Sequence, residues 1–181
     1  MHDFKCNPEM EISGQTLQAY VHNVQSDIIK PIFERNGMTD IDPKKWYPLQ
    51  PVLDILKRLS NSRSATTNLV AIGVKIAEYG VEPEDIIEAP LPVVLEHWQD
   101  HMNVSFRNGD PGTIITEKVH DKFYKVTQIN LFPDDFCYGL AYGFARSRLP
   151  LGTNFKVWYE EGVNRIDDGD GDKTIICIEW E

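Results

Sequence analysis

The fold of this chain is decided by residues 112–132, GTIITEKVHDKFYKVTQINLF. This stretch has two runs rich in β-branched and aromatic residues on either side of the polar triplet His120-Asp121-Lys122, which is the pattern of a β-hairpin. Residues 154–162 and 173–181 form a second pair of strand-like runs, joined by an acidic, glycine-bearing turn at 167–172. The sequence therefore predicts four strands, and we expect them to be antiparallel because each pair is local.

A helix is predicted between the two hairpins, over residues 133–148. It opens with Pro133 and two acidic residues, which are favourable at a helix N-terminus, and it closes with Arg146 and Arg148, which are favourable at the other end. The charge pattern therefore supports the helix independently of its apolar residues.

Amphipathic helical patterns fill the chain before the first hairpin. They cover residues 14–36 with a bend at Pro31, 52–59, 65–79 and 92–106, and Pro83 begins a further predicted turn of helix. Helices that precede and cover an antiparallel sheet define an α+β fold. We expect one such domain over residues 15–181, after a polar, flexible leader at 1–14.

The composition favours a folded, acidic protein. The chain has 181 residues, 41% of them hydrophobic, and a formal charge of −10, which repels phosphate backbones, so we expect no nucleic-acid partner. Three cysteines without CxxC spacing suit a reducing compartment, and no apolar run approaches the roughly 18 residues that span a bilayer. We therefore predict a cytoplasmic protein without a membrane span.

The sharpest candidate for site chemistry is the pair His97 and His101. The two residues are four apart on a predicted helix, so both imidazoles would lie on one face and would suit a transition metal or a heme iron. The alternative is that they flank the apolar stripe of Leu95, Trp98 and Met102 as boundary residues without a ligand.

A second candidate group lies early in the helix at 133–148. Cys137 is near the helix N-terminus, where the pKa of a thiol is lowered, although a cysteine among aromatic residues is also ordinary core material. Tyr138 and Tyr142 follow it, and the many aromatic residues of the chain suit either a core or a pocket for a flat, apolar ligand. The predicted lining of that pocket is His97, Trp98, His101, Cys137, Tyr138 and Tyr142.

The element order resembles that of the 4-vinyl-reductase-like and heme-NO-binding-like ligand domains. The resemblance rests on Trp98 followed by NGDPG at 108–112, on CYGLAYG at 137–143 and on the final strand ending in IEW. It implies a TRAPP-like α+β fold, small-molecule sensing with heme or a hydrophobic ligand, and a homodimer or a signalling partner. The YxSxR string of the heme-binding relatives and the cysteine-rich metal pattern of some 4-vinyl-reductase-like domains are both missing from the sequence.

Three functions are compatible with these patterns. The first is a sensory module with a ligand pocket between the helices and the sheet. The second is a protein-interaction or dimerisation module without a small ligand. A small enzyme that uses Cys137 or a histidine ranks last, because no nucleophile and base can be paired and no Walker, GxSxG or HExxH motif occurs.

Overall fold

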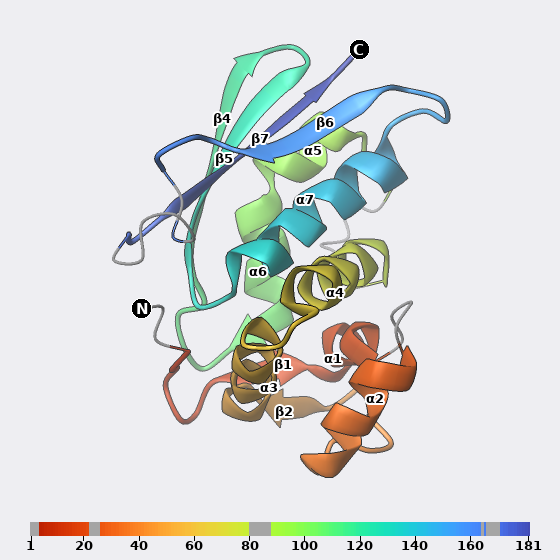
Figure 1. Cartoon of the computed structure of the whole chain (residues 1–181), viewed down its shortest axis with the longest axis vertical. Helices are drawn as coiled ribbons and strands as arrows, with labels where there is room; N and C mark the ends of the chain where they lie inside the picture. Colours follow the sequence, from red (N-terminus) through yellow and green to blue (C-terminus); the bar gives the residue numbers. More distant parts are fainter. Residues whose placement is uncertain (1–3, 22–25, 80–87, 164, 166–170) are drawn as a thin grey trace.

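The computed structural model describes residues 4–21, 26–79, 88–163, 165 and 171–181 (Figure 1). Its main sheet has four antiparallel strands in the order β4-β5-β7-β6. The strands are β4 (Gly112–His120), β5 (Phe123–Asn130), β6 (Phe155–Tyr159) and β7 (Thr174–Trp180). The two predicted hairpin strand pairs are thus confirmed, and β5 and β7 join them at the centre of the sheet.

The inner face of this sheet is set by the alternation of side chains along β5. Tyr124, Val126, Gln128 and Asn130 are all buried, whereas Ile129 on the other face is exposed. Successive side chains of a strand point to opposite faces. Two polar residues, Gln128 and Asn130, are therefore directed into the protein in phase with the apolar ones.

The helices form layers beneath that inner face (Figure 1). Helix α7 (Asp134–Arg148) lies next to the sheet, and α4 (Ala65–Tyr79) packs along α7 on its other side, with α1 (Gly14–Val21) and α3 (Gln50–Ser60) beyond. The predicted α+β class, with helices on one face of a four-stranded antiparallel sheet, is confirmed.

Two predicted helices are each divided in the structure. The pattern at 92–106 is split into α5 (Leu91–Glu96) and α6 (Trp98–Ser105), because His97 has a ψ of 15° and leaves the helical region. The spacing does not reveal the break, since backbone hydrogen bonds continue through it from His97 to Val93 and from His101 to His97. The pattern at 14–36 likewise forms α1 and a separate α2 (Ser26–Arg35), and Pro31 lies inside α2.

A second, three-stranded sheet was not predicted. It has the order β2-β1-β3 and consists of β1 (Glu11–Ser13), β2 (Trp46–Pro48) and β3 (Phe106–Arg107). Its central strand lies within the segment predicted as a leader, and Met10 and Ile12 are fully buried there. Strands of two or three residues have too short a pattern to be read from sequence.

Some sequence predictions fall on other parts of the chain. The predicted helical turn at Pro83 and most of the acidic turn at 167–172 lie outside the described residues. Within the described ranges, no helix has the length and apolar character needed to cross a bilayer.

Candidate functional site between α6, α7 and the sheet

A small cavity lies where the helical part meets the inner face of the sheet. Its volume is about 40 Å³, and its walls come from α1, α4, α6, α7 and the strands β3, β4 and β5. The aromatic part of the wall consists of Tyr20, Trp98, Phe106, Phe132 and Phe136. We call this space the His101 cavity, after the residue with the most distinctive environment in it.

The side chain of His101 is buried in α6 and has no hydrogen-bond partner among the described residues. Only 4% of the residue is exposed, and neither Nδ1 nor Nε2 meets a donor or acceptor among the described residues. The ring packs against Phe144, with 5.2 Å between the ring centroids. Burial, with the nearby positive charge of Arg148, lowers the pKa of His101 from 6.5 to about 4. The imidazole is therefore neutral at pH 7, with one N–H and one nitrogen lone pair.

Gln128 and Asn130 form a second polar group on the cavity wall. The Asn130 side chain donates from Nδ2 to Gln128 Oε1 over 2.6 Å, and its Oδ1 accepts from the backbone N–H of Phe132 over 3.0 Å. Gln128 is 1% exposed, and its Nε2 has no partner among the described residues. This amide nitrogen joins the two ring nitrogens of His101 as a buried polar atom of the cavity wall that has no partner among the described residues.

A chain of hydroxyl groups closes the α1 side of the cavity. Ser13 Oγ donates to Thr16 Oγ1 over 2.8 Å, and Thr16 Oγ1 donates to Ser105 Oγ over 3.2 Å. Ser105 in turn donates to the carbonyl oxygen of His101, one helical turn earlier in α6, over 3.2 Å. The chain ties β1 and α1 to α6.

The structure separates the two histidines that the sequence placed together. The side chain of His97 is 44% exposed, and its Nδ1 lies 3.0 Å from a carboxylate oxygen of Asp100. His97 does not line the His101 cavity. Among the described residues, no group of three or more His, Cys, Asp or Glu side chains is arranged to hold a metal ion.

Of the other four predicted lining residues, two line the cavity and two do not. Trp98 and Cys137 line the cavity, but Tyr138 donates its hydroxyl to the carbonyl of Val157 and Tyr142 packs on Phe155 at the surface. Burial raises the pKa of the Cys137 thiol to about 12, so the thiol stays protonated. The position of Cys137 near the helix N-terminus suggested a lowered thiol pKa, and burial produces the opposite shift.

Gln128 and Asn130 are the site residues that sequence reasoning missed. The signal was present, because both are polar residues in phase with Tyr124 and Val126 in a strand that alternates cleanly. A polar residue on the apolar side of such an alternation marks a buried hydrogen-bonding group.

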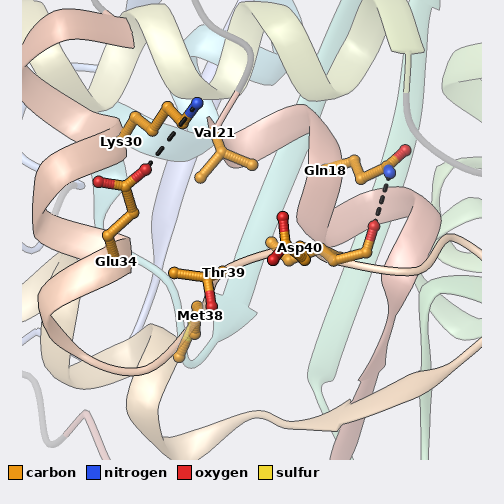
Figure 2. Close-up of a pocket in the computed structure, with 8 residues that line it drawn as sticks. Gln18, Val21, Lys30, Glu34, Met38, Thr39 and Asp40 are labelled. Atoms are coloured by element: carbon orange, nitrogen blue, oxygen red, sulfur yellow. Dashed lines mark hydrogen bonds and ion pairs between the residues drawn. The ribbon is translucent and has the colours of Figure 1, made fainter.

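A larger hollow lies at the surface beside α1 and α2 (Figure 2). Its volume is about 490 Å³, and its lining includes Gln18, Val21, Lys30, Glu34 and Met38. Three of its polar side chains are already paired within the protein: Lys30 with Glu34 at 3.8 Å, and Gln18 Nε2 with the carbonyl of residue 41 at 2.7 Å. The smaller His101 cavity, with its unpaired buried nitrogens, is the stronger candidate.

Solved structures of H-NOX proteins share the fold of this chain. An H-NOX protein from S. oneidensis in its Fe(II) ligation state matches with a TM-score of 0.66 at 12% identity, over 94% of this chain and 96% of that one. An H-NOX protein from T. tengcongensis matches with a TM-score of 0.62 at 15% identity, over 93% of this chain and 94% of that one. The sequence matches no family model and no curated protein. At these identities the likeness establishes the fold, an α+β domain of the H-NOX architecture.

This finding agrees with the heme-NO-binding side of the resemblance as far as the fold is concerned. The 4-vinyl-reductase-like and TRAPP-like names stay predictions.

Proposed function

We propose that this chain is a small-molecule-binding sensory domain whose ligand occupies the His101 cavity. The observation that carries the proposal is the neutral imidazole of His101, which is buried and whose two ring nitrogens have no partner in the part of the chain that the structure describes. Burying polar groups without hydrogen bonds costs about 1–3 kcal/mol each, and natural structures rarely leave them so. A bound molecule with a donor or acceptor would recover that energy.

The H-NOX neighbours make heme the first ligand to consider. Two of the S. oneidensis structures are described in the Fe(II) and Fe(II)NO ligation states, and another neighbour is described for heme redox potential and porphyrin distortion. An imidazole is a common axial ligand of heme iron, and His101 has the right chemistry for that role.

The cavity itself does not fit a heme. Its volume of about 40 Å³ compares with roughly 300–1,000 Å³ for the usual ligand pocket. The fully buried Tyr20, Trp98 and Phe136 fill the surrounding space. No lysine or arginine is among the described lining residues to pair with the propionates. The residues present fit a compact ligand, so we assign no heme, and no transition metal, to this site.

The proposal is tested by replacing one histidine ring at a time. His101→Phe keeps a ring of similar size and removes both nitrogens, and His97→Phe is the matched change at the exposed position. Protein purified from the native host is examined by absorbance and by mass spectrometry of extracted small molecules, and each variant is then titrated with hemin and with a panel of compact organic molecules. We expect the purified protein to show no Soret band. We expect panel members to raise the melting temperature of the wild type and of His97→Phe but not of His101→Phe.

Two outcomes would contradict this expectation in different ways. A Soret band that His101→Phe abolishes would show that heme, not a compact ligand, binds here. The absence of any co-purified molecule and of any thermal shift would remove the sensory proposal and leave the protein-interaction function, for which a homodimer or a signalling partner is still predicted.

A further inference from the structure

The orientation of the Gln128 amide is fixed by a backbone group. The N–H of Phe132 has only one role, that of donor, so the atom of Asn130 that it meets at 3.0 Å is the acceptor Oδ1. The other end of the Asn130 amide is then the donor Nδ2, and the Gln128 atom at 2.6 Å from it is the acceptor Oε1. The remaining Gln128 atom is Nε2, which carries two N–H groups and has no partner among the described residues.

The donors and acceptors in the hydroxyl chain are fixed in the same way, and all three hydroxyl protons are already used in hydrogen bonds within the protein. The backbone N–H of Thr16 donates to Ser13 Oγ, so the proton of Ser13 goes to Thr16, that of Thr16 to Ser105, and that of Ser105 to the His101 carbonyl. These three side chains keep only acceptor lone pairs. Among His101, the Gln128–Asn130 pair and the hydroxyl chain, the donors left for a ligand are the Gln128 amide and the single N–H of neutral His101.

The charge of the ligand is constrained by the same wall. None of the described lining residues is a lysine, an arginine or an acid, so a charged ligand would lose its hydration without a partner. An apolar body is matched by the aromatic side chains, and an uncharged acceptor is matched by the two donors.

We infer that Gln128 is the specificity-determining residue of the His101 cavity, and that the ligand is a compact, uncharged, largely apolar molecule with a carbonyl-type acceptor. This inference rests on the proposed function, because it names the ligand class of the same cavity. The Gln128 N–H groups donate to the ligand oxygen, and Asn130 holds the amide in that orientation.

The test uses three probes with the same four-atom skeleton. Acetone carries the carbonyl, isobutene replaces the oxygen with a methylene group, and acetate adds a negative charge. The full chain, labelled with ¹⁵N, is titrated with each probe, and two-dimensional NMR follows the Gln128 side-chain amide signal. We expect acetone to bind at least about tenfold more tightly than isobutene, which is about 1.4 kcal/mol, and we expect acetate not to bind.

The variant arm compares Gln128→Met with Gln15→Met, a matched change at an exposed position of α1. Acetone should lose its advantage over isobutene in Gln128→Met and keep it in Gln15→Met. An acetone preference that survives Gln128→Met would overturn the role of Gln128.

The wild-type titrations alone test the chemical class and the charge of the ligand, so this part of the test does not depend on the folding of a variant. Equal binding of acetone and isobutene would leave the cavity as a ligand site and overturn the carbonyl class. Tightest binding of acetate would overturn the uncharged class. Binding of none of the three would overturn both this inference and the proposed function.

Discussion

At the scale of the residue, two histidines four positions apart have opposite environments. His97 lies at the break between α5 and α6 and meets Asp100 at the surface, whereas His101 is 4% exposed and its ring nitrogens meet no hydrogen-bonding group among the described residues. Their spacing is helical, but the break at His97 changes the direction of the first side chain. One of the two is therefore a ligand candidate and the other a surface residue.

The buried imidazole makes the stability of the domain depend on pH. The pKa of His101 is about 4 in the folded protein and 6.5 when unperturbed, so between these values the unfolded chain binds a proton that the folded chain does not. Stability should fall as the pH decreases from about 6.5 to about 4, by roughly 3 kcal/mol from this group, and the loss should level off below that range.

Urea denaturation of the wild type and of His101→Phe at a series of pH values measures this contribution. The free energy of unfolding of the wild type should fall relative to that of His101→Phe as the pH decreases through that window. Parallel curves would show that His101 is not buried in the neutral form.

At the scale of the element, the contact between α4 and α7 depends on small residues. A Cβ atom at Gly73 would lie 2.3 Å from the carbonyl oxygen of Phe136 and 2.8 Å from the amide nitrogen of Leu140. A Cβ atom at Gly139 would lie 2.4 Å from the carbonyl oxygen of Val70. The backbones of the two helices are thus in direct contact, and this contact places the cavity residues of α7.

We expect Gly73→Ala to destabilise the protein by about 1–3 kcal/mol, because the atoms it meets are backbone and cannot rotate away. The higher helix propensity of alanine, worth up to about 1 kcal/mol, offsets only part of this cost. Urea denaturation at pH 7 measures the change. Thr67→Ala, at an exposed position of the same helix, should stay within about 0.5 kcal/mol, and a neutral Gly73→Ala would mean that the helices are not in contact.

At the scale of the whole molecule, the N-terminal segment belongs to the architecture. Strand β1 lies between β2 and β3, so residues 11–13 join the loop before α3 to the end of α6. Glu11 also pairs with Arg107 at 2.6 Å across this sheet. The segment thus pairs with strands far along the chain, and Glu11 and Arg107 are 96 residues apart in the sequence.

A chain of residues 15–181 should therefore fold less stably than the full protein. It lacks the fully buried Met10 and Ile12, each worth about 1.5–3 kcal/mol of burial, and it lacks the central strand of the second sheet. Thermal unfolding followed by circular dichroism measures the loss, with Glu9→Ala as the control at an exposed neighbouring position. An unchanged melting temperature for 15–181 would show that residues 1–14 are a dispensable leader.

Elements with local patterns could be predicted from the sequence alone. The hairpin at 112–132, the helix from Asp134 to Arg148 and the order of helices before sheet all follow from periodicity and terminal charges over ten to twenty residues. This is why the fold class was predictable and agrees with the H-NOX structures.

The candidate site, in contrast, depends on contacts between distant parts of the chain. His101 and Gln128, whose buried nitrogens have no partner among the described residues, line one cavity because α6, α7 and β5 converge there. Strand β1 pairs with Phe106 and Arg107 across more than ninety residues. Neither the shared cavity nor the pairing of β1 with β3 leaves a pattern in the local sequence. The periodicity of a helix or strand shows which of its faces is apolar, but not which other element covers that face. The energy that fixes the site comes from packing between distant segments. No single stretch of the chain contains those contacts, so no local pattern can reveal them.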